Sequence, residues 1–230
     1  MGHTAARRGT GFRLVEAGTV AAGGLAAVGL VAISTYAKWR PWCIQWGATA
    51  DEAARRLPGD DLVAEPDLVT TRAITIAAPP ASVWPWLVQM GPDRGGVYTY
   101  DWIENLFGLG VHSVDTLLPE FQHLEVGDAQ RLGASGPVLR VAIVDPSQAM
   151  VLRSDDGHWT WAFVLVAGEA GTRLISRNRI VLPQDTAFTR WFYTYAMEPG
   201  SLVMERKMLL GIKERAERLV DRHAAVQAAA

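Results

Sequence analysis

The region from residue 128 to residue 181 holds a series of strand-like segments with no helical segment between them. The segments cover 128–132, 138–144, 150–153, 159–166 and 172–181, and a further alternating segment at 71–76 precedes them. Turn residues such as Asp145-Pro146 and Gly157 separate neighbouring segments. Connections this short join strands antiparallel, because a parallel connection needs a dozen or more residues. The pattern therefore predicts an antiparallel sheet.

Helical segments flank this strand-rich region. We expect two short helices, at 80–88 and at 101–107, and a long amphipathic helix from Ser201 to Arg222. The apolar positions of the long helix are Met204, Met208, Ile212, Ala216 and Leu219, and Glu205 is expected on the opposite, charged side. Segregated strands and helices predict an α+β domain, a curved antiparallel sheet laid against one helix. We place this domain at 70–223 and a disordered tail at 224–230.

The N-terminal region has the pattern of a membrane anchor. Residues 17–37 hold no ionisable side chain except the Tyr36 phenol, and as a helix they would extend about 31 Å, close to the roughly 30 Å of a bilayer core. Trp39, Trp42 and Trp46 follow, and tryptophan prefers the headgroup layer. The sequence predicts a basic N-terminus at 1–16, a transmembrane helix at 17–37, and a connector at 38–69 with one short helix that begins at a capping box of Thr49 and Glu52.

Other interpretations of 17–37 stay open, namely a cleaved signal peptide or a buried helix of a soluble domain. The basic residues on the two sides of the segment do not decide which side of the membrane holds the main domain. Gly18, Ala22 and Ala26 form a stripe of small residues that would allow two such helices to pair, so a homo-oligomer is one possible assembly. The expected location is a membrane, with a single pass.

Composition excludes several kinds of function. The chain has 22 Lys and Arg against 24 Asp and Glu, which leaves no excess positive charge for nucleic acid. A single cysteine, Cys43, excludes an internal disulfide and a cysteine-based zinc site. The five histidines lack metal-ligand spacing, and no phosphate-binding loop is present. We therefore expect no metal and no cofactor.

The element order and several stretches resemble the START / Bet v 1-like superfamily, also called SRPBCC or polyketide cyclase/dehydrase-like proteins, and within it a bacterial membrane-anchored subgroup of unassigned function. The stretches that carry the resemblance are 46–49, 57–60, 78–91, 95–105, 119–122, 126–128 and 204–209. The resemblance implies a helix-grip fold, in which a curved sheet surrounds a long C-terminal helix. It also implies a hydrophobic cavity between sheet and helix that holds lipids or other apolar molecules. Some members are cyclases or dehydratases.

The last hairpin offers candidate ligand-binding residues. If its loop spans 167–171, Trp161 lies opposite Arg177 and Trp159 lies opposite Arg179, on one side of the sheet. Aromatic walls with convergent cations suit an apolar molecule that bears an anionic head. An exposed Trp–Arg ladder that only stabilises the sheet is the alternative. The full set of expected ligand-binding residues is Trp159, Trp161, Phe163, Arg177, Arg179, Tyr98 and Tyr100.

Weaker candidates exist for acid–base chemistry. Asp101 and Glu104 lie one helical turn apart, and His112 precedes Asp115 by three residues. These observations favour a membrane-anchored module that binds a hydrophobic small molecule or lipid. The alternatives are a cyclase/dehydratase-type enzyme that acts on an apolar substrate, with these residues as its acid and base, and a non-catalytic membrane interaction protein.

Overall fold

The computed structural model describes residues 35–106, 110, 112–131, 136–182 and 186–229. The chain forms two compact units, Met1–Pro41 and Trp42–Ala230. Of the first unit only residues 35–41 are described, and they are helical. Across the described ranges, no helix combines the length and the apolar character that a bilayer crossing requires. The segment predicted to span a membrane, 17–37, lies outside the described residues except for its last three positions.

The second unit is built on one six-stranded antiparallel sheet with the strand order β1-β6-β5-β4-β3-β2. The strands are β1 (Leu68–Ile76), β2 (Ala129–Arg131), β3 (Val138–Asp145), β4 (Ala149–Ser154), β5 (Trp159–Gly168) and β6 (Gly171–Ile180). Each matches a strand-like segment of the sequence. The predicted antiparallel sheet is therefore confirmed.

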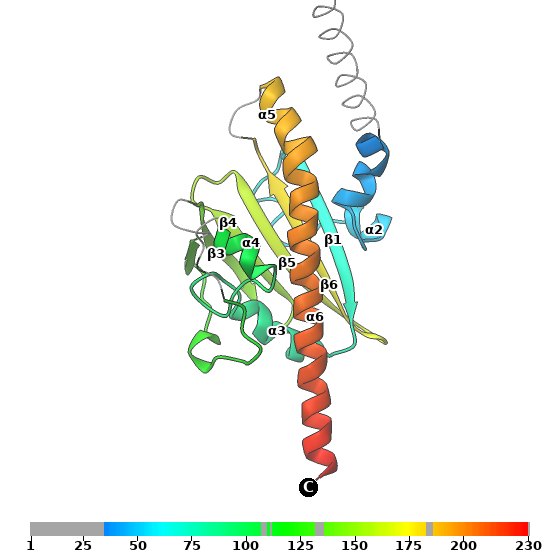
Figure 1. Cartoon of the computed structure of the whole chain (residues 1–230), viewed down its shortest axis with the longest axis vertical. Helices are drawn as coiled ribbons and strands as arrows, with labels where there is room; N and C mark the ends of the chain where they lie inside the picture. The colour runs from blue at the N-terminus through cyan, green and yellow to red at the C-terminus, as the bar shows by residue number, and fades with distance from the viewer. Residues whose placement is uncertain (1–34, 107–109, 111, 132–135, 183–185, 230) are drawn as a thin grey trace, which may run out of the picture. The chain divides into compact units, whose positions relative to one another are not determined.

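The helix α6 (Glu198–Ala228) lies along one side of this sheet and crosses it from end to end (Figure 1). The other elements are α2 (Ala50–Ala54), α3 (Pro80–Val88), α4 (Asp101–Leu106), the 3₁₀ helix η1 (Pro119–Phe121), α5 (Ala187–Phe192) and the π-helix η2 (Tyr193–Met197). A sheet that packs against one long C-terminal helix is the predicted helix-grip arrangement. The main core lies between the sheet and the helices α3 and α6, where Trp86, Phe163 and Leu209 are almost completely buried.

The helix α6 differs from its prediction at both ends. It begins at Glu198 as a direct continuation of the preceding helical residues, and Pro199 lies in its first turn. It continues to Ala228 through residues expected to form a disordered tail, since alanine has the highest helix propensity. Helices α5 and η2, which lead directly into α6, were not expected from the sequence.

The register of the β5–β6 hairpin is shifted by one residue from the expected one. A two-residue turn lies between Gly168 and Gly171, so Trp161 pairs with Asn178 and Ala162 pairs with Arg177. Gly171 has φ +113° and a Cβ there would lie 2.2 Å from the Ile76 carbonyl oxygen, so this turn requires glycine.

A one-residue shift moves every side chain of one strand to the other side of the sheet. The tryptophans of β5 and the arginines of β6 therefore lie on opposite sides. Ser176, the neighbour of Trp161, contacts α6, whereas Arg177 contacts the connector around α2. The prediction that Trp159, Trp161 and Phe163 share one side with Arg177 and Arg179 is wrong.

Candidate functional site

Three aromatic rings of β5 form a stack on the helix-facing side of the sheet. The rings of Trp159 and Trp161 are nearly parallel, with centroids 5.9 Å apart and an interplanar angle of 19°. The ring of Phe163 lies 4.9 Å from that of Trp161 and is fully buried. The two indoles remain partly exposed although they lie on the side that packs against the helices. Solvent therefore reaches the sheet beside its packed core.

Hydrogen bonds hold both indoles in place. Trp159 Nε1 donates to Asn178 Oδ1 and Trp161 Nε1 donates to Ser176 Oγ, each at 2.9 Å. Buried or half-buried indoles usually need such a partner for the N–H group. Because these partners come from the neighbouring strand β6, the rings present only their apolar faces to whatever lies beside them.

A buried polar network continues from these partners to α6. Ser176 Oγ donates to Glu205 Oε1 at 2.6 Å, and Glu205 forms an ion pair with Arg72 of β1. The Arg72 side chain has no exposed area, and its guanidinium also donates to the Cys43 carbonyl oxygen at 3.1 Å and to Ser201 Oγ at 3.0 Å. Both charges are therefore compensated within the protein.

This network corrects the expected position of Glu205. The sequence places Glu205 on the charged side of the long helix, but in the structure its side chain is only 6% exposed. Neither Arg72 nor Glu205 was identified as a candidate residue. The available signal was a charged residue within an apolar pattern, since Ile74 and Ile76 share the sheet side of Arg72.

On the opposite side of the sheet, the arginines of β6 hold the connector. Every guanidinium N–H of Arg177 donates a hydrogen bond, and the acceptors are Thr71 Oγ1, the carbonyl oxygens of Glu52, Ala53 and Arg55, and Asp60 Oδ2. Three of these carbonyls lie at the end of α2, where a helix leaves such groups without an internal partner. Arg177 lines a cavity of about 670 Å³, but no N–H group of its guanidinium is free for a ligand.

Two further arginines of β6 have the same role. Arg179 donates to the carbonyl oxygens of Val63 and Ala64 at 2.8 and 2.9 Å. Arg173 donates to both carboxylate oxygens of Glu52, at 2.7 and 2.9 Å. The capping box of Thr49 and Glu52 is confirmed, with hydrogen bonds of 2.8 and 3.1 Å. The compact unit consequently includes the connector from Trp42 onward, whereas the sequence places the start of the domain at residue 70.

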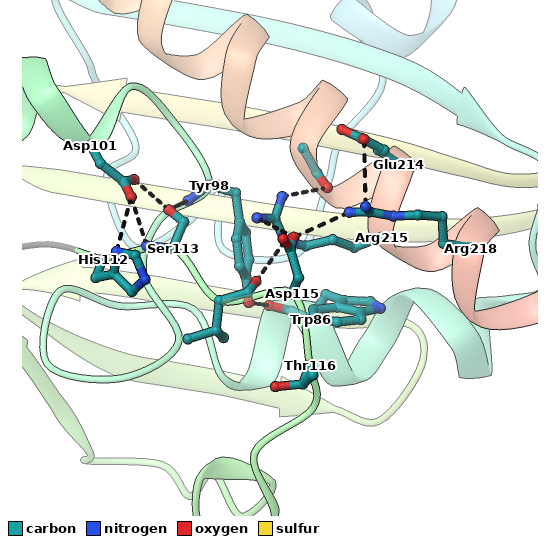
Figure 2. Close-up of polar contacts among 12 residues, drawn as sticks. Trp86, Tyr98, Asp101, His112, Ser113, Asp115, Thr116, Glu214, Arg215 and Arg218 are labelled. Atoms are coloured by element: carbon teal, nitrogen blue, oxygen red, sulfur yellow. Dashed lines mark hydrogen bonds and ion pairs between the residues drawn. The ribbon is translucent and has the colours of Figure 1, made fainter. Parts of the chain in front are cut away.

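A second, polar cavity of about 270 Å³ lies where Tyr98 and the loop after α4 meet α6. Figure 2 shows Asp115 of the loop between two arginines of α6, with Arg215 Nη2 at 2.9 Å and Arg218 Nη2 at 3.1 Å. Asp101, on the far side of the cavity, accepts hydrogen bonds from the Ser113 N–H at 2.9 Å and the Ser113 hydroxyl at 2.7 Å. These contacts attach the loop to the helix.

One of the two expected acid–base pairs, His112 with Asp115, has a different partner in the structure. His112 lies beside Asp101, with Nδ1 3.8 Å from Oδ2, instead of forming the expected pair with Asp115. The side chains of His112 and Asp115 are 89% and 61% exposed, respectively. The Glu104 side chain lies outside the described part of the structure. In the described structure, Asp101 holds the Ser113 backbone and hydroxyl groups and Asp115 pairs with two arginines of α6.

Tyr98 is a buried core residue beside the polar cavity. Its hydroxyl donates to the Trp86 carbonyl oxygen at 3.1 Å, and the Arg215 guanidinium lies 4.7 Å from the centre of its ring (Figure 2). Burial raises the pKa of the Tyr98 phenol to about 12. Tyr100, the other tyrosine predicted to bind ligand, lies with its ring 5.9 Å from Lys207 Nζ of α6. Among the described residues, no group of three or more His, Cys, Asp or Glu side chains is arranged to hold a metal ion.

The strand order and the long helix across one side of the sheet define an α+β protein of the helix-grip type. No protein-family model matches the sequence, and no curated protein matches it. Solved structures of polyketide cyclase-like and AHSA1-like proteins do match this fold.

Two of these similar structures are bacterial proteins. A polyketide cyclase-like protein from Corynebacterium glutamicum is 16% identical, with a TM-score of 0.42, over 67% of this chain and 94% of that one. An AHSA1-like protein from Aeromonas hydrophila is 13% identical, with a TM-score of 0.37, over 66% of this chain and 94% of that one.

A third similar structure is DynU16, described as a protein of the dynemicin biosynthetic locus. It is 15% identical, with a TM-score of 0.39, over 63% of this chain and 46% of that one. Superpositions at these scores carry no conclusion about activity. The helix-grip assignment depends on the strand order and the helix of this chain itself.

Proposed function

We propose that this protein binds an apolar small molecule or lipid on the helix-facing side of its sheet, against Trp159 and Trp161. One observation carries the proposal: two parallel indoles on that side have satisfied N–H groups and yet remain partly exposed. Aromatic faces without free donors favour an apolar partner, because a polar ligand would lose its water contacts without gaining hydrogen bonds. As part of the same proposal, the segment 17–37 tethers the domain to a membrane.

The charges around the stack favour a ligand without an anionic head. Arg177 and Arg179 lie on the opposite side of the sheet and hold the connector. Arg72 lies on the correct side, but Glu205 neutralises it. A carboxylate or phosphate brought to the stack would be desolvated without gaining any of these three arginines as a partner. The ligand class that fits is therefore neutral and apolar.

The test is whether an apolar compound co-purifies with the full-length protein and whether its binding requires Trp161 of the stack. The protein is purified in mild detergent, and native mass spectrometry with analysis of an organic extract identifies bound compounds. We expect one neutral apolar compound at a fixed ratio to wild-type protein, and its loss from Trp161→Ala. Trp102→Ala is the matched control, because Trp102 of α4 is 69% exposed. Retention of the compound by Trp161→Ala, or a wild-type protein without any compound, would refute the proposal.

A second variant guards against loss of binding through misfolding. Trp161→Phe keeps an aromatic face and removes the five-membered ring of the indole with its N–H group, so it should retain more of the compound than Trp161→Ala does. Circular dichroism checks that each variant keeps the wild-type fold. The cyclase/dehydratase activity and the pairing of helices through Gly18, Ala22 and Ala26 stay predictions from the sequence; the pairing stripe lies outside the described residues.

A further inference from the structure

The segment that leads into α6 exposes an unusual number of large apolar side chains. On α5 and η2, Phe188 is 72% exposed, Trp191 49%, Phe192 41% and Met197 45%. The ring of Phe188 stacks with those of Trp191 and Phe192, at centroid distances of 6.1 and 6.5 Å. We call these four residues the aromatic ridge. Contiguous exposed apolar side chains mark a contact site for a protein, a ligand or a membrane.

The charge of this segment favours a membrane. Residues 186–197 contain no acidic residue and one basic residue, Arg190, whose side chain is 54% exposed and lies 3.4 Å from Asp67 Oδ1. The next acidic residue along the chain, Glu198, is only 2% exposed. Tryptophan, tyrosine and phenylalanine beside an arginine are typical of segments in the headgroup layer, where the rings sit among the headgroups and the cation meets anionic lipid.

The aromatic ridge lies close to the point where the chain enters the second unit. Arg72 donates to the carbonyl oxygens of both Cys43 and Glu198, at 3.1 and 3.5 Å. The entry of the chain into the second unit and the C-terminal end of the ridge therefore meet at one guanidinium group. Cys43 follows Ala37, the last residue of the predicted span, by six positions, and even a fully extended chain of this length covers only about 20 Å.

The ridge lies at the N-terminal end of α6, far from the C-terminus of the chain. Figure 1 shows α5 at the end of α6 that is opposite the C-terminus. From Glu198 to Val226 the helix advances by about 42 Å at ~1.5 Å per residue. A membrane next to the chain entry consequently has the ridge within reach, and the far end of α6 is well away from it.

We propose that the aromatic ridge inserts into the headgroup layer of a phospholipid bilayer and holds the domain against the membrane that carries the tether. The inference rests on the membrane tether of the proposed function and is independent of the ligand. The insertion buries rings that are exposed in the structure, so its driving force is the transfer of apolar area from water. Arg190 strengthens the contact on anionic lipid.

The experiment compares two equally exposed positions in the full-length protein. In a Cys43→Ala background, which keeps the Cys43 carbonyl contact, Phe188→Cys and Val226→Cys are each labelled with an environment-sensitive fluorophore. Val226 is the matched control because it is 69% exposed against 72% for Phe188. The protein is reconstituted into vesicles of phosphatidylcholine and phosphatidylglycerol. We expect a blue shift and severalfold quenching by nitroxide lipids at position 188, and neither at position 226.

Each other outcome overturns the proposal in a distinguishable way. A label at position 188 that is blue-shifted but not quenched by lipid indicates a protein contact, either with residues 17–41 or with a second copy of the chain. If the label is neither shifted nor quenched although the protein stays with the vesicles after an alkaline wash, the result would support the membrane tether and refute the insertion of the ridge. Loss of the protein in that wash, together with an unquenched label, would refute both the membrane tether and the insertion of the ridge.

A variant of the ridge itself gives an independent check. With the label at Met197→Cys, the double substitution Phe188→Ser/Trp191→Ser should abolish most of the lipid quenching, because it removes the two most exposed of the three rings in the ridge. Trp102→Ser, at an exposed tryptophan of α4 outside the ridge, should leave the quenching unchanged. Equal quenching in both variants would refute an insertion through the ridge.

Discussion

Arg72 of β1 and Glu205 of α6 form an ion pair in the protein interior, where their side chains are 0% and 6% exposed. The two residues are 133 positions apart in the sequence, so the pair joins the first strand of the sheet to the last helix. Ser176 and Asn178 of β6 donate further hydrogen bonds to the same carboxylate, at 2.6 and 3.3 Å. The Glu205 carboxylate of α6 is thus held by side chains of two strands, β1 and β6.

The first prediction concerns the loss of one partner of this pair. Arg72→Met should lower the free energy of unfolding by about 3–5 kcal/mol, because it leaves the Glu205 carboxylate buried without a countercharge. Chemical denaturation followed by circular dichroism measures the change.

Two controls separate this effect from a general loss of packing. The double variant Arg72→Met/Glu205→Leu should recover most of the lost stability, because apolar residues of similar size often replace a buried pair without loss. Arg140→Met removes an exposed pair with Asp155, with side chains 52% and 47% exposed, and should change stability by about 0–1 kcal/mol. If Arg72→Met is as mild as Arg140→Met, the interior pair does not hold the helix.

The secondary structure could be predicted because its signals are local. The alternation of Ile74 and Ile76 indicates β1, and the spacing of Thr49 and Glu52 indicates the start of α2. In both cases the residues that determine the element lie within a few positions of one another. The same holds for the strand boundaries set by Pro, Gly and Asp turns.

The candidate site could be predicted only in part, because it depends on pairings that the local pattern leaves open. The sequence from Ala167 to Gly171 is compatible with a longer loop or with the two-residue turn that forms, and this difference alone decides whether Arg177 faces the stack or the connector. A Gly-x-x-Gly spacing was the available signal for the short turn. The Arg72–Glu205 pair could not be predicted as a pair, since nothing local relates residues so distant.

The second prediction concerns the close approach of α6 to the loop after α3. A Cβ at Gly211 would lie 2.7 Å from the Tyr98 carbonyl oxygen and 3.0 Å from the Tyr98 Cβ. Tyr98 cannot yield easily, because it is buried and has φ +58°. Gly211→Ala should therefore lower the free energy of unfolding by about 1–3 kcal/mol, the usual range for overpacking, despite the better helix propensity of alanine.

Gly200→Ala is the matched control in the same helix. A Cβ at Gly200 meets no atom within 4 Å, so this substitution should raise stability by about 0.5–1 kcal/mol through propensity and a less flexible unfolded chain. Thermal unfolding of the two variants beside the wild type measures both effects. Shifts of the same sign would show that the contact with Tyr98 does not limit residue 211.

The last prediction concerns stability in acid. The hydrogen bonds from Arg173 lower the pKa of Glu52 from 4.5 to about 2. The folded state therefore holds the Glu52 proton more weakly than the unfolded state does. The resulting stabilisation is fully present above about pH 4.5 and is lost as the pH falls toward 2. Because Glu52 keeps some contact with solvent, we expect this contribution to be about 2 kcal/mol after screening.

Glu52→Gln removes the ionisable group and keeps the size of the side chain. It should be less stable than wild type at pH 7, by about 2 kcal/mol, and most of the difference should be lost by pH 2, where the wild-type carboxyl is itself about half protonated. Asp51→Asn, at the exposed neighbour of Glu52 in the same helical turn, should change stability by about 0.5 kcal/mol or less at either pH. Urea unfolding at a series of pH values measures the three proteins. A difference between Glu52→Gln and wild type that persists unchanged at pH 2 would show that the Arg173 contact does not depend on the charge of Glu52.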